Sequence, residues 1–294
     1  MSWFKPAYFE GRNIDETWFN GLKTIAAFGR KYVKTDGSGA GKDFLELDHA
    51  SGVIYKPIEF SDSGELLPLA PTVPDGCPVP TTDASIQEYF LEHLINGVCK
   101  PNEHYKYGTF IAGGPHSINV VGGYKESKYV GTSSTVFDQT LSLYVPNQLQ
   151  WCIDHFLKIT KDGTYNFKNN HCVIQVGYPE SQLEYDKPYV DEIDRGTSPC
   201  LRLIDFKLID NKGEWNLCAY VYFRAWNLFA AWPENLGGIS LLQYYMAEAL
   251  SVAAPVKVGP LSFFSKSLNI YCDMLDAIRM RIGVSNEFGF EKED

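Results

Sequence analysis

Two alternating runs of apolar and polar residues dominate the second half of the chain. One covers residues 200–209 and the other residues 215–224, and between them lies a turn at residues 210–213 that is rich in Asp, Asn and Gly. This pattern predicts an antiparallel hairpin. Because hairpin strands of similar length pair side by side, we expect Cys200, at the start of one strand, to lie close to Arg224, at the end of the other.

Apolar residues at helical spacing predict further elements on both sides of this hairpin. After Pro233 the spacing predicts a long helix to about residue 250. Other helices are expected over residues 15–30, 83–96, 147–158 and 272–282. Asp15 and Asp83 are the expected N-caps of the first two. In the first helix, we expect Trp18, Leu22, Ile25 and either Ala26 or Phe28 to point inward. Strands are expected over residues 117–121, 169–179 and 258–271. Residues 66–82 hold five prolines and predict an extended connection.

Charge, hydropathy and length indicate the expected partners, location and number of domains. The net charge of -10 comes from scattered acidic residues, so we expect neither a nucleic-acid polymer nor an anionic membrane as partner. No apolar run approaches membrane-spanning length and the first residues lack a signal pattern, which favours a cytoplasmic protein. We expect a single domain over residues 1–294, with a looser N-terminal portion over residues 1–82.

The cysteines and histidines do not form metal or disulfide patterns. The seven cysteines are odd in number and contain no CxxC, and the six histidines lack ligand spacing, so no metal site is expected. The glycine-rich residues 36–42 (DGSGAGK) resemble a phosphate-binding loop, but Asp36 stands where the first glycine belongs, which favours an ordinary loop.

Cys200 and Arg224 are the strongest candidates for chemistry. Only the thiolate of a cysteine attacks, and a free thiol is roughly a few per cent ionised at pH 7, so a nucleophilic cysteine needs a cation nearby. Arg224 can supply that charge, or can bind a phosphate with its forked guanidinium. The alternative is that Cys200 is a buried structural thiol.

Four motifs occur in a recognisable order between residues 147 and 271. They are PC before a strand, Y-x-R-A-W-N, P-x-N-L-G-G at the opening of a helix, and S-x-x-L-N-I-Y. Together they resemble the thymidylate synthase superfamily, and the N-terminal W-x-x-x-L helix and the Y-x-Y-G element are similar to its archaeal and nucleotide-hydroxymethylase branches. The resemblance implies an α+β fold with a large mixed sheet flanked by helices, and a homodimer whose sheets pack back to back.

The resemblance also implies residue roles. Cys200 would attack carbon 6 of a pyrimidine nucleoside 5'-monophosphate, and 5,10-methylenetetrahydrofolate would supply the one-carbon unit to carbon 5. Arg224 would bind the phosphate and favour the thiolate, and Asn235 would contact the pyrimidine edge. Tyr271 would contact the sugar, and Tyr107 would belong to the proton-transfer network.

Departures from the synthase pattern indicate a subgroup. Ala225 replaces a serine, as in CMP hydroxymethylases, and Lys168 is our candidate for a phosphate ligand that enters from the partner subunit. Asn227 replaces the aspartate that binds the folate, with Trp226 beside it, and Asn269 replaces a histidine on the sugar side. The apolar C-terminal closing segment of the synthases is missing, and a site that closes less tightly favours water over hydride transfer.

We therefore expect a nucleotide 5-hydroxymethylase, a transferase acting on a ribonucleotide, either UMP or CMP. Thymidylate synthesis from dUMP is the first alternative, and a non-catalytic nucleotide-binding protein is the second. The amide of Asn235 favours uracil because it can donate and accept, but a flipped amide would also suit cytosine.

Overall fold

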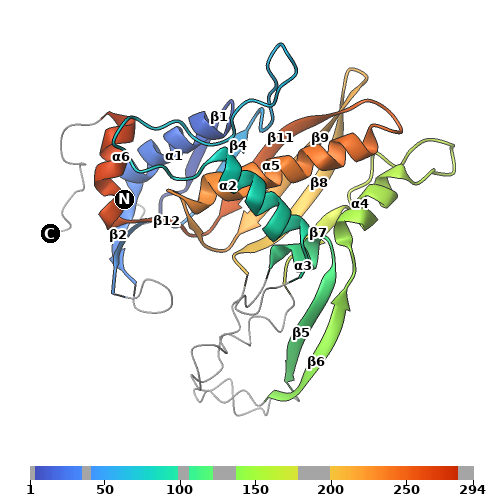
Figure 1. Cartoon of the computed structure of the whole chain (residues 1–294), viewed down its shortest axis with the longest axis horizontal. Helices are drawn as coiled ribbons and strands as arrows, with labels where there is room; N and C mark the ends of the chain where they lie inside the picture. Colours follow the sequence, from blue (N-terminus) through green and yellow to red (C-terminus); the bar gives the residue numbers. More distant parts are fainter. Residues whose placement is uncertain (1–3, 35–40, 99–105, 122–136, 178–198, 284–294) are drawn as a thin grey trace.

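The computed structural model describes residues 4–34, 41–98, 106–121, 137–177 and 199–283. These residues form an α+β structure with two mixed sheets flanked by helices (Figure 1). A separate two-stranded ribbon, β5 (Gly114–Val121) and β6 (Phe137–Val145), extends away from both sheets. In these ranges, no helix has the length and apolar character that crossing a membrane requires.

The larger sheet has six strands in the order β1-β4-β11-β9-β8-β7. Its strands are β1 (Ala7–Gly11), β4 (Ala50–Ile54), β11 (Val256–Ser265), β9 (Glu214–Phe223), β8 (Leu201–Asn211) and β7 (Val173–Gln175). The pairs β1/β4 and β11/β9 are parallel, and the other pairs are antiparallel. The predicted hairpin is confirmed as β8 and β9, although its loop is only Lys212 and Gly213, both with positive φ.

The smaller sheet has four strands in the order β10-β12-β3-β2. They are β10 (Trp226–Asn227), β12 (Leu268–Tyr271), β3 (Asp43–Leu47) and β2 (Arg30–Val33). Three of them continue strands of the larger sheet after only two residues: β3 leads to β4, β9 to β10 and β11 to β12. The two sheets are thus halves of one surface that bends where these strands connect. We call this bend the corner; it consists of Asp48–His49, residues 224–225 and residues 266–267.

Helix α5 (Ala231–Leu250) lies across one face of the larger sheet (Figure 1). Its buried side chains include Leu236, Ile239, Leu242 and Met246. Gln243 is fully buried, and its Nε2 donates to the carbonyl oxygens of Leu217 (2.6 Å) and Gly259 (2.9 Å). The register of β9 and β11 shifts at this point, so the glutamine satisfies carbonyls that the irregular ladder leaves free.

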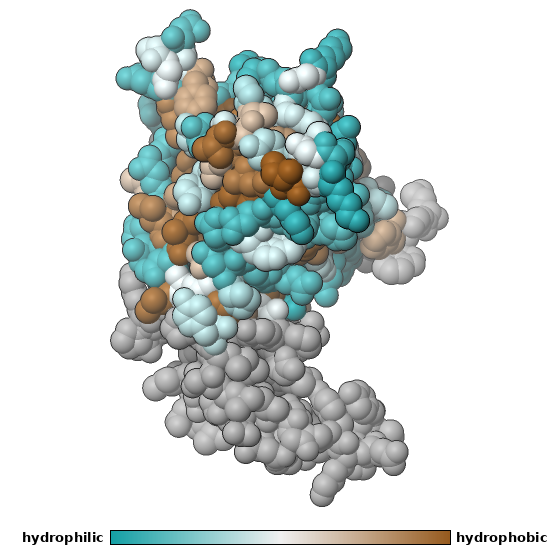
Figure 2. Space-filling model, turned by 90° about the vertical axis from the view of Figure 1, so that its right-hand side faces the viewer, coloured by the Kyte–Doolittle hydropathy of each residue, from teal (hydrophilic) through white to brown (hydrophobic). Residues whose placement is uncertain are grey.

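The remaining helices cover the edges of this arrangement. They are α1 (Ile14–Phe28), α2 (Asp83–Tyr89) with a π-helical turn (Phe90–Ile95), α3 (Tyr107–Ile111), α4 (Gln148–Leu157) and α6 (Leu275–Ile282) after a 3-10 turn (Cys272–Met274). On the side of the molecule at the right of Figure 1, apolar patches lie among hydrophilic ones (Figure 2). Ile209 of β8 and Val252 after α5 are among the exposed apolar side chains.

Several sequence predictions need correction. Helix α1 is capped by Asn13, whose side chain accepts from the Glu16 amide, and not by Asp15. Helix α2 is capped by Thr82, since Asp83 accepts instead from the amides of Leu69 and Ala70. Of the two alternatives for the last inward position of α1, Ala26 is buried and Phe28 is exposed.

The strand boundaries also differ. The single strand expected over residues 258–271 is two strands, β11 and β12, which belong to different sheets. The strand expected over residues 169–179 is reduced to Val173–Gln175 among the described residues, and most of the glycine-rich residues 36–42 lie outside them. The N-terminal portion contributes four strands that the sequence analysis did not predict, and Trp18 of α1 is fully buried.

Candidate active site

Cys200 and Arg224 lie side by side at the corner. Cys200 immediately precedes β8 and Arg224 immediately follows β9, and the Arg224 amide donates to the Cys200 carbonyl oxygen (2.8 Å). The Arg224 Nε also donates to the Pro199 carbonyl oxygen (3.2 Å). The predicted proximity of the two residues is therefore confirmed, and it follows from the antiparallel pairing of the hairpin.

Tyr107 joins this pair from another part of the chain. Its hydroxyl accepts a hydrogen bond from the amide of Leu201, the residue after Cys200 (3.4 Å). Tyr107 is the first residue of α3, a short helix that the sequence analysis did not predict. The Arg224 guanidinium and the Tyr107 hydroxyl thus both bond to the main chain on either side of Cys200, where β8 begins.

Cys200 differs from most other cysteines of the described residues in its exposure. Cys77, Cys152, Cys172 and Cys218 are buried, whereas Cys200 and Cys272 are partly exposed. Burial raises the pKa of Cys218 to about 11, which keeps that thiol protonated and unreactive at neutral pH. Burial also raises the pKa of Cys272. Cys200 is thus the partly exposed cysteine that has an arginine beside it.

Asn235 lies in the second turn of α5 and is held by Trp226. The Trp226 Nε1 donates to the Asn235 Oδ1 (2.9 Å), and both residues are buried. An indole nitrogen is a donor only, so the amide oxygen must face it. This hydrogen bond selects one of the two amide orientations that the sequence left open.

Asn227 and Asn269 face each other across the parallel strands β10 and β12. The Asn227 Oδ1 accepts from the Ala230 amide (3.1 Å), and the Asn269 Nδ2 donates to the Ser267 hydroxyl (3.5 Å). These bonds leave the amide nitrogen of Asn227 and the amide oxygen of Asn269 for other partners. Trp226 is only 3% exposed, so the contact with folate expected for it stays a prediction. Ala225 is partly buried between Arg224 and Trp226.

Tyr271 and Lys168 lie in other surroundings. Tyr271, at the end of β12, packs against Phe44 (4.4 Å between ring centroids), with the Lys42 ammonium 5.0 Å from its ring centroid. Lys168 is exposed and lines a cavity of about 580 Å³ together with Phe167 and Trp215. Its expected role concerns the site of a partner subunit, so this single chain does not test it.

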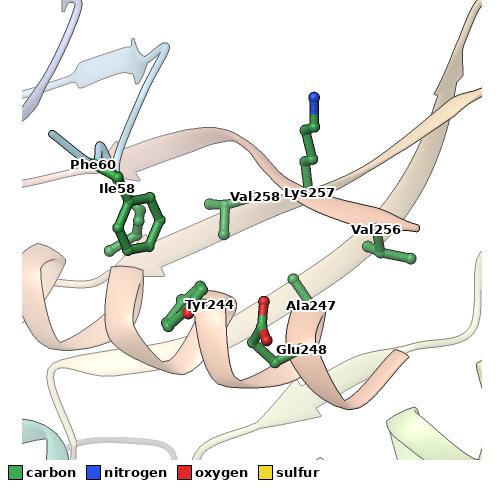
Figure 3. Close-up of a pocket in the computed structure, with 8 residues that line it drawn as sticks. All are labelled: Ile58, Phe60, Tyr244, Ala247, Glu248, Val256, Lys257 and Val258. Atoms are coloured by element: carbon green, nitrogen blue, oxygen red, sulfur yellow. The ribbon is translucent and has the colours of Figure 1, made fainter. Parts of the chain in front are cut away.

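A second cavity, of about 320 Å³, lies between α5 and β11 (Figure 3). Tyr244, Ala247 and Glu248 of the helix face Val256–Val258 of the strand, and Ile58 and Phe60 border one side. None of the candidate site residues lines it. In the described ranges, no group of three or more His, Cys, Asp or Glu side chains could hold a metal ion.

The sequence analysis missed Lys106 and Glu234. The Lys106 side chain is fully buried next to Tyr107, with its ammonium 3.7 Å from the Glu92 carboxylate. A lysine between two tyrosines gives no signal of burial in the sequence. Glu234, the neighbour of Asn235, has its pKa raised above the usual value because it is partly buried.

The chain has no match among protein-family models, and no significant match among curated proteins.

Proposed function

We propose that this protein transfers a one-carbon unit from 5,10-methylenetetrahydrofolate to carbon 5 of a pyrimidine nucleoside 5'-monophosphate. The preferred reaction is 5-hydroxymethylation of a ribonucleotide, UMP or CMP. The observation that carries the proposal is the meeting of Cys200, Arg224 and Tyr107 at the ends of β8 and β9. We place this chemistry in the cytoplasm, where a thiol such as that of Cys200 stays reduced.

Each of these three residues has a role in the proposed reaction. The Cys200 thiolate forms a bond to carbon 6 of the pyrimidine, which makes carbon 5 nucleophilic. Arg224 binds the phosphate through its guanidinium and supplies the positive charge that favours the thiolate. The Tyr107 hydroxyl both accepts and donates hydrogen bonds, so it relays the proton that leaves carbon 5.

The free amide groups at the corner fit a folate cofactor. The Asn227 Nδ2 is a donor and the Asn269 Oδ1 is an acceptor, and the two residues are paired across β10 and β12. A pterin ring offers both donors and acceptors along its edge, so this pair can hold it without the carboxylate of the synthases. The bound cofactor supplies a methylene carbon that becomes attached to carbon 5 of the base.

Ala225 supports a ribonucleotide substrate. It directly follows Arg224, is partly buried and has a methyl group where the synthases have a serine hydroxyl. The smaller side chain leaves room for a ribose 2'-hydroxyl, and we assign Lys168 of a second subunit to the phosphate. Tetrahydrofolate would leave with its nitrogen and the electron pair of the C–N bond as the proton departs from carbon 5. Water would then add to the exocyclic methylene and lose a proton, and the Cys200 sulfur would leave carbon 6 as a thiolate while the double bond between carbons 5 and 6 re-forms.

We also infer the fold and the homodimer of the thymidylate synthase superfamily. The face of the larger sheet opposite α5 carries partly or fully exposed side chains in rows across the strands. One row consists of Tyr8, Ser51, Phe264, Tyr222 and Leu203, and the next consists of Glu10, Val53, Ser262, Tyr220 and Asp205. Aromatic residues such as the stacked Tyr222 and Phe264 (5.2 Å between ring centroids) suit burial against the same face of a second chain.

Release of tritium from carbon 5 tests the proposed reaction. UMP, CMP, dUMP and dCMP labelled at carbon 5 are each incubated with the protein, with and without methylenetetrahydrofolate. We expect release that depends on the cofactor for at least one nucleotide, and a hydroxymethylated product by mass spectrometry. A methylated product would instead support thymidylate synthesis.

Two cysteine variants show whether Cys200 is the nucleophile. Cys200→Ala should reduce release by at least about a thousandfold, because no other group replaces the thiolate. Cys272→Ala is the matched control, since Cys272 is also a partly exposed free cysteine, and it should keep wild-type release. Nucleotide binding without release from any of the four substrates would refute the enzyme and favour a binding protein.

A further inference from the structure

The side chain of Asn235 is only half satisfied within the described part of the chain. Its Oδ1 accepts from the Trp226 indole (2.9 Å), but its Nδ2 donates to no described residue. Asn235 is 8% exposed, so this donor has little contact with water. A ligand with an acceptor atom at this position would satisfy it.

The indole that holds Asn235 is itself fixed. Trp226 is 3% exposed and stacks on Phe223, with 3.8 Å between ring centroids and 10° between ring planes. Its amide donates to the Ser267 carbonyl oxygen (2.8 Å), which attaches its backbone to the strand beside it. The indole therefore presents its N–H in a constant direction.

A flip of the Asn235 amide would turn Nδ2 toward the indole N–H. Two donors would then face each other and the buried indole N–H would lose its acceptor, which is unfavourable. Asn235 hence presents its N–H groups, and not its oxygen, on the side away from Trp226.

We propose that Trp226 is a positioning residue that fixes Asn235 as a hydrogen-bond donor to an exocyclic carbonyl oxygen of the base, and so selects uracil over cytosine nucleotides. The inference rests on the proposed function. Uracil has a carbonyl oxygen at carbon 4, which accepts from the Asn235 Nδ2. Cytosine has an amino group there, which would oppose the same N–H groups.

Binding measurements on the intact protein test this selection. The dissociation constants of UMP, dUMP, CMP and dCMP are measured by calorimetry for the wild type and for Trp226→Phe. The wild type should bind the uracil nucleotides about 10- to 100-fold more tightly than the cytosine nucleotides with the same sugar. In Trp226→Phe, which lacks the indole N–H, this ratio should fall by about tenfold because the amide can then turn.

Trp232→Phe is the matched control. Trp232 is fully buried, packs against Trp226 (5.9 Å between ring centroids) and has no hydrogen-bond partner for its Nε1 in the described residues, so the substitution removes similar volume beside Trp226 but keeps the hydrogen bond from Trp226 to Asn235. Its uracil-to-cytosine ratio should equal that of the wild type. Asn235→Asp provides a second variant if Trp226→Phe does not fold, because an aspartate keeps the acceptor for the indole and loses the donors. It should lose the preference for uracil.

The outcomes separate this inference from the proposed function. If uracil nucleotides bind and the ratio is unchanged in Trp226→Phe, or if cytosine nucleotides bind the wild type equally well, the role of Trp226 is refuted while the proposed reaction stands. If none of the four nucleotides binds the wild type, both are refuted.

Discussion

Replacement of Gln243 by methionine tests how α5 is held on the larger sheet. The change keeps a side chain of similar length but removes both Nε2 donors, so the carbonyls of Leu217 and Gly259 lose their partner. Each buried carbonyl without a partner costs roughly 1 to 3 kcal/mol. The Oε1 of Gln243 has no partner in the described residues, so its removal returns roughly the cost of one such group.

The net loss in the free energy of unfolding should therefore be about 2 kcal/mol. Urea denaturation at a fixed protein concentration measures it, since dimerisation would otherwise alter the apparent stability. Ser240→Ala is the control: Ser240 is also buried on α5, but its hydroxyl bonds only to the Leu236 carbonyl of its own helix. If Gln243→Met is no less stable than Ser240→Ala, the proposed satisfaction of these carbonyls is wrong.

Two further predictions concern pH and assembly. Burial raises the pKa of Glu234 above its usual value of 4.5, so the folded state holds this proton more tightly than the unfolded state. The free energy of unfolding should therefore fall as the pH rises from about 4.5 through the higher pKa of the folded state. Glu234→Gln should lack this fall. If the free energy of unfolding of both proteins depends on pH in the same way, Glu234 is not its cause. On the open sheet face, Phe264→Glu should convert the proposed dimer into a monomer by light scattering, whereas Tyr245→Glu, on an exposed position of α5, should not. An unchanged mass for both variants would argue against this interface.

The sequence predicted the elements whose periodicity is long and regular. The strands β8 and β9 and the helix α5 each extend over ten or more residues, so one or two exceptional residues do not hide their apolar–polar pattern. The strands β1 to β4 have only four or five residues each and were missed. In β4 the pattern is further obscured by Gly52, where a side chain would collide with the Phe9 carbonyl and the Phe263 ring.

Helix caps show how distant contacts override local rules. Asp15 and Asp83 were reasonable caps from the sequence, but each carboxylate bonds elsewhere, Asp15 to Arg281 (2.8 Å) and Asp83 to the Leu69 amide (2.7 Å). The neighbouring Asn13 and Thr82 cap the helices instead. Such choices depend on residues far along the chain and cannot be read from a local pattern.

Some features of the candidate site follow from local sequence patterns, and others depend on distant contacts. The proximity of Cys200 and Arg224 follows from hairpin register, so the sequence alone was sufficient to predict it. The hydrogen bond from Trp226 to Asn235 depends on how α5 docks against β10, and the burial of Lys106 depends on how α3 packs. Neither has a counterpart in spacing or composition.

At the corner, main-chain hydrogen bonds hold the strands together, and the side chains determine what the site can bind. There the main chain is tied by its own amides, from Arg224 to Cys200 and from Trp226 to Ser267, so the ladder does not depend on which side chains are present. These main-chain bonds would persist if the side chain of Ala225 were exchanged, whereas Arg224 and Ser267 also make side-chain hydrogen bonds. Under the proposed function, a change at Ala225 in the corner, or at Asn227 in the adjoining strand β10, could alter what the site binds while the strands stay paired.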